Sequence, residues 1–225
     1  MSCCRCEGLE SQFDCKTAER ELRRFRRRGP TRSTQLLIDA LRDAGVAGAS
    51  LIDIGGGVGA IHHTLLDAGA ASAAQVDISP EYINAARDEA ARRGHWNRVL
   101  FVHGDFVQLA TQMPDADIVT LDRVICCYPD MPALVGGAAD RARRVVGAVY
   151  PPDTWWMRIG VRAVNALMRL RRSEFRVYMH SPVDIDDVLQ RRGLERVTRR
   201  RTILWEIAIY ERPAAAWLAA QSRKA

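Results

Sequence analysis

Hydrophobic and polar positions along the middle of the chain follow two alternating periods. Short apolar runs rich in β-branched residues occur at 50–54, 74–77, 99–103, 117–121 and 145–150. Apolar residues at helical spacing fill the intervals near 60–69, 80–93, 106–111 and 131–143. Regular alternation of strand and helix predicts an α/β fold, in which helices cover both faces of a mostly parallel sheet.

The two ends of the chain carry different patterns. Apolar residues at helical spacing before Gly29-Pro30 predict one amphipathic helix, and a second is expected over 33–43. Towards the C-terminus we expect a long helix at 153–172, a short extended piece at 175–179 and a helix at 182–192. Extended runs at 194–200 and 203–210 are joined by a tight turn, so they must pair antiparallel.

A glycine-rich turn follows the first predicted strand. The stretch LIDIGGGVGAIHHTLL, residues 51–66, places Gly55, Gly56, Gly57 and Gly59 between a strand and a helix. Such a turn lets a ligand approach the main chain and the free N–H groups of the helix N-terminus. The turn lacks the Lys and Ser or Thr of a triphosphate-binding loop, and it matches a dinucleotide fingerprint only in its alanine-ending form, through Ala60.

The pattern D-x-G-x-G-x-G, formed by Asp53, Gly55, Gly57 and Gly59, resembles motif one of class I S-adenosylmethionine-dependent methyltransferases. The resemblance implies S-adenosylmethionine as cofactor. The carboxylate of Asp53 would help to hold its ammonium group, and would repel a pyrophosphate. Asp77 ends the second strand 20 positions after Gly57, where a carboxylate can accept hydrogen bonds from both ribose hydroxyls.

The same resemblance implies the rest of the cofactor site and the architecture. Ile78 would press on the adenine, and Asp105 would accept its amino group with Phe106 beside it. Residues Asp122 to Tyr128 would line the reaction chamber. Asp105 also suits a helix N-cap. The family fold is a Rossmann-like, seven-stranded, mostly parallel sheet with an antiparallel C-terminal strand. It implies a methyltransferase domain over 45–225 with an inserted helix near 153–172, and a capping segment over 1–44.

A narrower resemblance rests on three stretches. The segments CCRCEG, RRFRRRGP and YPPDTWW are similar to proteins grouped with magnesium-protoporphyrin O-methyltransferase. The resemblance favours O-methyl transfer to a small, apolar and anionic molecule, such as a porphyrin-like carboxylate. It does not fix the substrate.

Candidate catalytic residues follow the fourth strand and the late extended piece. His180 is a candidate general base, and Tyr128 is a candidate contact for the acceptor. Cys126 and Cys127 are either reactive thiols or small apolar packing groups. His62 and His63 lie in the first turn of the helix after the glycines, from which one of them can face the cofactor.

The cysteines and the charge leave two other functions open. Cys3, Cys4, Cys6 and Cys15 lack paired C-x-x-C spacing, so no metal site is predicted, although a thiol-based metal- or metalloid-binding protein remains an alternative. The net charge of +6 suits anionic partners, including nucleic acid. The motifs of exocyclic-amine and cytosine C5 methyltransferases are absent, which argues against a nucleic-acid substrate.

The predicted helix at 153–172 carries two stripes. Arg158, Arg162, Asn165, Arg169 and Arg172 follow helical spacing on one side, and Trp155, Ile159, Ala163, Leu167 and Leu170 follow it on another. The pattern fits a packed helix, a lid over the acceptor or a helix on an anionic membrane surface. The sequence shows neither a signal-peptide pattern nor an apolar run of ~18 residues, so we expect a cytoplasmic protein. It leaves the oligomeric state open.

Overall fold

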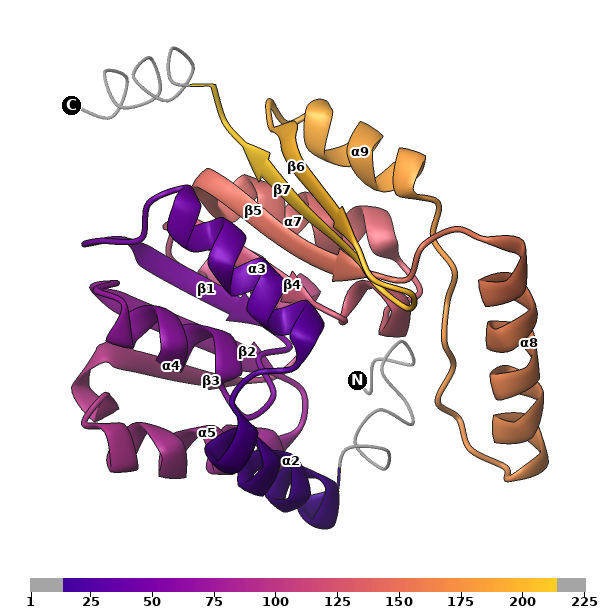
Figure 1. The fold of residues 1–225 in the computed structure, drawn as a ribbon, viewed down its shortest axis with the longest axis horizontal. Helices are drawn as coiled ribbons and strands as arrows, with labels where there is room; N and C mark the ends of the chain where they lie inside the picture. Colours follow the sequence, from indigo (N-terminus) through magenta and orange to yellow (C-terminus); the bar gives the residue numbers. More distant parts are fainter. Residues whose placement is uncertain (1–13, 214–225) are drawn as a thin grey trace.

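A seven-stranded sheet organises the computed structural model, which describes residues 14–213 (Figure 1). The strand order is β3-β2-β1-β4-β5-β7-β6. Strands β1 to β5 pair in parallel, and β7 runs antiparallel to both β5 and β6. The strands are β1 Ser50–Ile54, β2 Ser72–Asp77, β3 Val99–His103, β4 Ala116–Asp122, β5 Ala142–Tyr150, β6 Glu195–Arg201 and β7 Glu206–Glu211. The predicted α/β fold class is confirmed.

Helices cover both faces of this sheet. They are α2 Cys15–Arg28, α3 Arg32–Asp43, α4 Ala60–Asp67, α5 Pro80–Arg93, α6 Phe106–Leu109, α7 Met131–Arg141, α8 Trp155–Leu170 and α9 Pro182–Gln190. Side chains of α3 and α4 pack on one face of the sheet, and those of α7 and α9 pack on the other. Polar side chains cap several helices, as where Ser79 accepts a hydrogen bond from the Tyr82 N–H at the start of α5.

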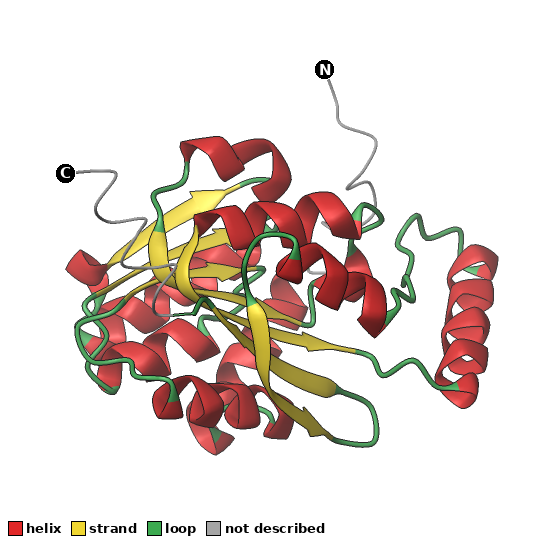
Figure 2. Cartoon of the chain, turned by 90° about the horizontal axis from the view of Figure 1, so that it is seen from above, coloured by secondary structure: helices red, strands yellow, loops and turns green. Residues whose placement is uncertain are grey.

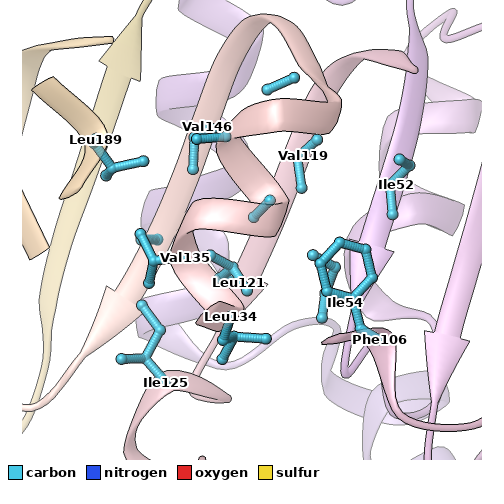
Figure 3. Close-up of a cluster of buried hydrophobic side chains, with 14 of the residues drawn as sticks. Ile52, Ile54, Phe106, Val119, Leu121, Ile125, Leu134, Val135, Val146 and Leu189 are labelled. Atoms are coloured by element: carbon cyan, nitrogen blue, oxygen red, sulfur yellow. The ribbon is translucent and has the colours of Figure 1, made fainter. Parts of the chain in front are cut away.

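The side-chain alternation of the strands divides the core into two layers. Leu51 points to the α3 and α4 face, whereas Ile52 and Ile54 point to the α7 face. Figure 3 shows Ile52, Ile54 and residues of β4 and β5 gathered around α7. The alternation fixes which face each polar residue of a strand meets. Asp53, between Ile52 and Ile54, therefore points to the α3 and α4 face.

A buried carboxylate joins elements that are distant in sequence. Glu89 of α5 is fully buried and accepts hydrogen bonds from Arg26 of α2, Arg92 and Arg93. Burial alone would raise the pKa of Glu89, but hydrogen bonds from these three arginines together lower it. This cluster holds α2 against α5 beside the candidate site.

The structure differs from the sequence-based boundaries at several element ends. The predicted helix at 131–143 ends at Arg141, because Ala142 already pairs with Ala116 as the first residue of β5. Residues 175–179 form no strand within the described chain. Instead, the Val177 N–H bonds the Asn165 side chain, and the Tyr178 N–H bonds the Cys126 carbonyl.

Helix α8 lies beside the sheet, away from both helical layers (Figure 2). The chain leaves β5 through residues 151–154 to reach it and returns through 171–181 to α9. Among the described helices, α8 included, none has the length and apolar character needed to cross a membrane.

Candidate active site

A pocket of about 490 Å³ lies at the carboxyl ends of the parallel strands. Ile54 and the glycine turn after β1, Asp77 at the end of β2, and Asp122 at the end of β4 all line it. In open α/β sheets this edge is the usual place for ligands, because the strand ends and helix starts converge there. Glu21 of α2 also lines the pocket, so a helix of the N-terminal segment contributes to it.

Asp77 lies at the centre of the cofactor end of this pocket. Its Oδ2 accepts the Gly57 N–H at 2.9 Å, and its Oδ1 accepts the Ser79 N–H at 2.9 Å. Burial raises the pKa of Asp77 to about 6, against the lowering effect of these two N–H groups. Each oxygen keeps a further lone pair, so the ionised carboxylate can accept two more hydrogen bonds from a ligand.

The glycine turn is shaped by close neighbours as well as by backbone conformation. Gly55, Gly57 and Gly59 have φ of 63°, 54° and 81°. A Cβ on Gly56 would lie 2.9 Å from Asp53 Oδ2, and one on Gly59 would lie 2.6 Å from His62 Nε2. Larger residues would therefore clash with the supports of the turn. Gly55, Gly56 and Gly57 line the pocket, whereas Gly59 forms the N-cap of α4 outside its lining.

Asp53 is fully buried beneath the turn. The strand alternation points its side chain towards α4, where Oδ2 lies 2.9 Å from His62 Nδ1 and Oδ1 accepts the Thr120 hydroxyl at 2.7 Å. Asp53 forms part of the pocket wall, yet both carboxylate oxygens already bond to protein groups. Its position thus fits a support for the glycine turn better than a free anion facing a ligand.

His62 and His63 both point into the protein. His63 lies 3.2 Å from His95 and 3.1 Å from the Ala86 carbonyl, and burial lowers the pKa of His63 to about 2. His62 Nε2 is buried and has no hydrogen-bond partner within residues 14–213. Within the described chain, neither imidazole belongs to the pocket lining.

Asp105 and Tyr128 form one unit across the pocket. Asp105 caps α6 by accepting the Val107 N–H at 3.0 Å, and the Tyr128 hydroxyl donates to its carboxylate at 3.0 and 3.2 Å. Phe106 and Ile78 line the pocket next to this pair. The structure shows the N-cap role of Asp105, and the same residue lines the pocket.

Asp122 and Arg123, at the end of β4, also line the pocket. Asp122 accepts the Thr34 hydroxyl at 2.7 Å, and burial raises its pKa. Arg123 adopts φ of 61°, a left-handed conformation that is costly for a residue with a Cβ and that concentrates at functional sites. Its guanidinium lies 6.0 Å from the Trp205 ring and 3.3 Å from Asp122 Oδ1.

Apolar side chains form the remainder of the pocket, which we call the acceptor end. Its walls come from five separate segments: the turn after β4, helix α7, Pro151, helix α8 with its return loop, and the β6–β7 turn. They are Val124, Cys126, Cys127, Leu134, Pro151, Met157, Val161, Val177, Leu204 and Trp205. The Sγ atoms of Cys126 and Cys127 lie 3.9 Å apart. Arg123, whose guanidinium pairs with Asp122, lies next to this apolar space in the pocket lining.

Sequence and structure comparisons place this geometry among known proteins. Residues 51–146 match the family model described as a methyltransferase domain. The ribosomal protein L11 methyltransferase of Erwinia tasmaniensis is 37% identical over 90 residues, which cover 39% of this chain and 29% of that protein. Its counterpart from Pseudomonas aeruginosa is 26% identical over 171 residues, covering 75% of this chain and 51% of that protein. This chain thus spans about half, or less, of these relatives.

Solved structures share the whole fold. Magnesium protoporphyrin IX methyltransferase from Synechocystis PCC 6803, with bound SAH, superposes with a TM-score of 0.70 at 21% identity, covering 91% of this chain and 98% of that chain. An O-methyltransferase family protein from Burkholderia thailandensis superposes with a TM-score of 0.67 at 20% identity, covering 91% of this chain and 62% of that chain. In motif and in fold, this chain resembles the class I S-adenosylmethionine-dependent methyltransferases.

The methyltransferase fold gathers most of the predicted site residues and leaves some outside. Asp53, Gly55, Gly56, Gly57, Asp77, Ile78, Asp105, Phe106, Asp122 and Tyr128 all line one pocket. His180 is not brought into this lining. Its Nε2 donates to the Tyr128 carbonyl at 2.9 Å, which fastens the return loop after α8 to the turn after β4. Cys3, Cys4 and Cys6 lie outside the described residues.

Two contributors to the pocket lining, Glu21 and Trp205, were not among the residues predicted from the sequence. Glu21 carries no motif and reaches the pocket only because α2 packs on α5. Trp205 lies on a turn far along the chain. Arg123, by contrast, belongs to the stretch 122–128 that the sequence-based resemblance placed along the reaction chamber, and it does line the pocket.

Proposed function

We propose that this protein is an S-adenosylmethionine-dependent methyltransferase that methylates an oxygen of a small, apolar, anionic molecule. One observation carries the proposal. A single pocket joins a cofactor end built around Asp77 and the glycine turn to an apolar acceptor end with the Arg123 guanidinium at its border. Methyl transfer requires donor and acceptor in one such space.

The residues of the cofactor end fit the cofactor that the family model and the fold support. Asp77 would accept the two ribose hydroxyls, since its ionised oxygens keep lone pairs beside the Gly57 and Ser79 N–H groups. Ile78 and Phe106 would contact the adenine, and Asp105 would accept its amino group while Tyr128 orients the carboxylate. Asp122 would face the methionine part, and Asp53 would support the turn from below.

The acceptor end would select an apolar acid. Arg123 would pair with a carboxylate of the acceptor, and the apolar walls would exclude water from the reacting atoms. When bound, S-adenosylmethionine supplies a methyl group on a sulfonium, which a nucleophilic oxygen displaces in line. A carboxylate is already ionised, so this reaction needs no general base. His180 and Tyr128 would then position the site instead of moving a proton.

The experiment uses cofactor with a labelled methyl group. Incubation with cell extract should place the label in a small, apolar product, and mild alkali should release it as methanol, because methyl esters hydrolyse there while methyl ethers do not. Label in protein or RNA, or an alkali-stable product, would overturn the acceptor assignment. The ribosomal-protein methyltransferases among the relatives make label in protein the outcome to exclude first.

An Arg123→Ala variant tests the role of the guanidinium once a product is in hand. We expect the KM for the acceptor to rise about 10- to 100-fold, since a desolvated charge-assisted contact contributes about 1.5–3 kcal/mol. Cofactor affinity, measured by calorimetry, should change less than about twofold. Arg143→Ala, on β5 and outside the pocket lining, is the matched control.

A further inference from the structure

Helix α8 has two faces with different surroundings. Its inner face places Met157 and Val161 in the pocket lining, and Asn165 exchanges two hydrogen bonds with the Val177 backbone at 2.7 and 2.9 Å. These contacts orient the helix. Every residue of α8 is nevertheless at least partly exposed within the described chain, and Figures 1 and 2 show the helix standing beside the sheet.

The outer face of α8 is apolar and open to solvent. It consists of Trp155, Trp156, Ile159, Leu167 and Leu170, with exposed fractions of 75%, 37%, 54%, 44% and 81%. Because these residues recur at helical spacing, they form one continuous stripe. Isolated exposed apolar residues are common, but a contiguous stripe with two tryptophans marks a contact surface.

Positive charge lies alongside this stripe. The helix contains no acidic residue, and Arg158, Arg162 and Arg169 follow one another along it, with Arg171 and Arg172 directly after its end. Arg158 pairs with Asp153 at 2.6 Å. For the other four, no carboxylate of residues 14–213 lies within ion-pair distance, so their charge is available to an anionic partner.

We propose that the outer face of α8 docks on an anionic lipid bilayer. A helix with an apolar stripe, tryptophans and a flanking row of arginines lies in the plane of a membrane interface, with the stripe among the acyl chains and the arginines at the phosphates. Charge complementarity favours this occupant over a second copy of the chain, whose α8 would bring arginines against arginines. The helix binds the surface and does not cross it.

Docking through the outer face would leave the inner face on the pocket. Met157 and Val161 would then hold the acceptor end next to the bilayer surface, where an apolar acid concentrates. This consequence for the acceptor rests on the proposed function, whereas the docking itself does not.

The test is sedimentation of the full chain with vesicles of phosphatidylcholine alone or with about a third phosphatidylglycerol. We expect at least tenfold tighter binding to the anionic vesicles, weakening with salt. The double variant Ile159→Asp, Leu167→Asp should lose at least about tenfold in affinity. The double variant Arg162→Glu, Arg169→Glu should lose the salt-dependent part of the affinity for anionic vesicles.

The matched control is Arg27→Glu, Arg28→Glu on α2, which removes the same charge from a helix whose apolar face is buried. It should change vesicle affinity less than about threefold. Retained cofactor binding will show that each variant is folded. The proposal fails if the wild-type protein does not bind anionic vesicles, or if the α2 variant weakens binding as much as the α8 variants do. It also fails if the protein forms a dimer, seen by light scattering, that the Ile159→Asp, Leu167→Asp variant abolishes.

Discussion

The two ends of the pocket are built in different ways. The cofactor end is made by three short strand-to-helix turns, and its carboxylates and glycines are held by buried partners such as His62, Thr120 and Ser79. Peripheral segments contribute Val161, Val177 and Trp205 to the acceptor end. One end is thus fixed by the core, whereas the other also depends on the placement of peripheral segments.

The largest expected effect concerns Asp77. Replacement by Ala should weaken S-adenosylmethionine and S-adenosylhomocysteine at least about 100-fold by calorimetry, because two charge-assisted hydrogen bonds of about 1.5–3 kcal/mol each are lost. Asp88→Ala, an exposed change on the neighbouring helix α5, should leave both affinities unchanged. Equal losses in the two variants would mean that the cofactor end is not where we place it.

A second prediction asks how tightly the core holds the glycine turn. Gly59→Ala should lower the free energy of unfolding by about 2–4 kcal/mol, because its Cβ would press on the buried His62 and the residue has positive φ. Gly94→Ala also has positive φ, but nothing lies within 4 Å of its Cβ. That change should cost only about 1 kcal/mol. Denaturant unfolding of the two variants would give the difference, and equal losses would show that the turn has room to relax.

Cofactor affinity should depend on pH through Asp77. Its pKa is raised by burial to about 6, and only the ionised carboxylate can accept both ribose hydroxyls. The dissociation constant should therefore rise about tenfold per unit as pH falls below 6, and be flat above it. Calorimetry from pH 5 to 8 measures this, and Asp77→Asn should remove the slope.

The same raised pKa has a consequence for the free protein. A folded-state pKa above the unfolded value of 3.8 means that protonation of Asp77 stabilises the fold at low pH. This contribution is lost as pH rises from about 4 to about 6, so Asp77 costs stability at neutral pH. A stability profile of Asp77→Asn that matches wild type across this window would contradict the assignment.

The smallest expected effect lies on α8. Ile159→Ala should change the free energy of unfolding by less than about 0.5 kcal/mol, because the side chain is 54% exposed on the outer face. Ile52→Ala, which removes a fully buried side chain of β1, should cost about 2–5 kcal/mol. Chemical denaturation compares the pair. A large loss at Ile159 would mean that α8 packs against the body, which would erase the contrast between the two ends.

The amino-acid sequence was sufficient for the parallel sheet, the glycine turn and Asp77, because each depends on local order. Strand periodicity, the glycines and an acid at a fixed distance along the chain are short-range features, and the strand ends of an α/β sheet converge by topology. The same locality explains why the bounds of β1, β3 and α5 agree with the periodicity.

The tertiary structure alone decided the rest. The register of β1 with β4 and the packing of α4 turned Asp53 towards Thr120 and His62, although the sequence pattern alone suggested a ligand contact. Docking of α2 on α5 brought in Glu21, the return loop bound His180 to a backbone carbonyl, and the position of α8 exposed its apolar stripe. These outcomes depend on contacts between segments far apart in the chain, which periodicity and motif spacing do not encode.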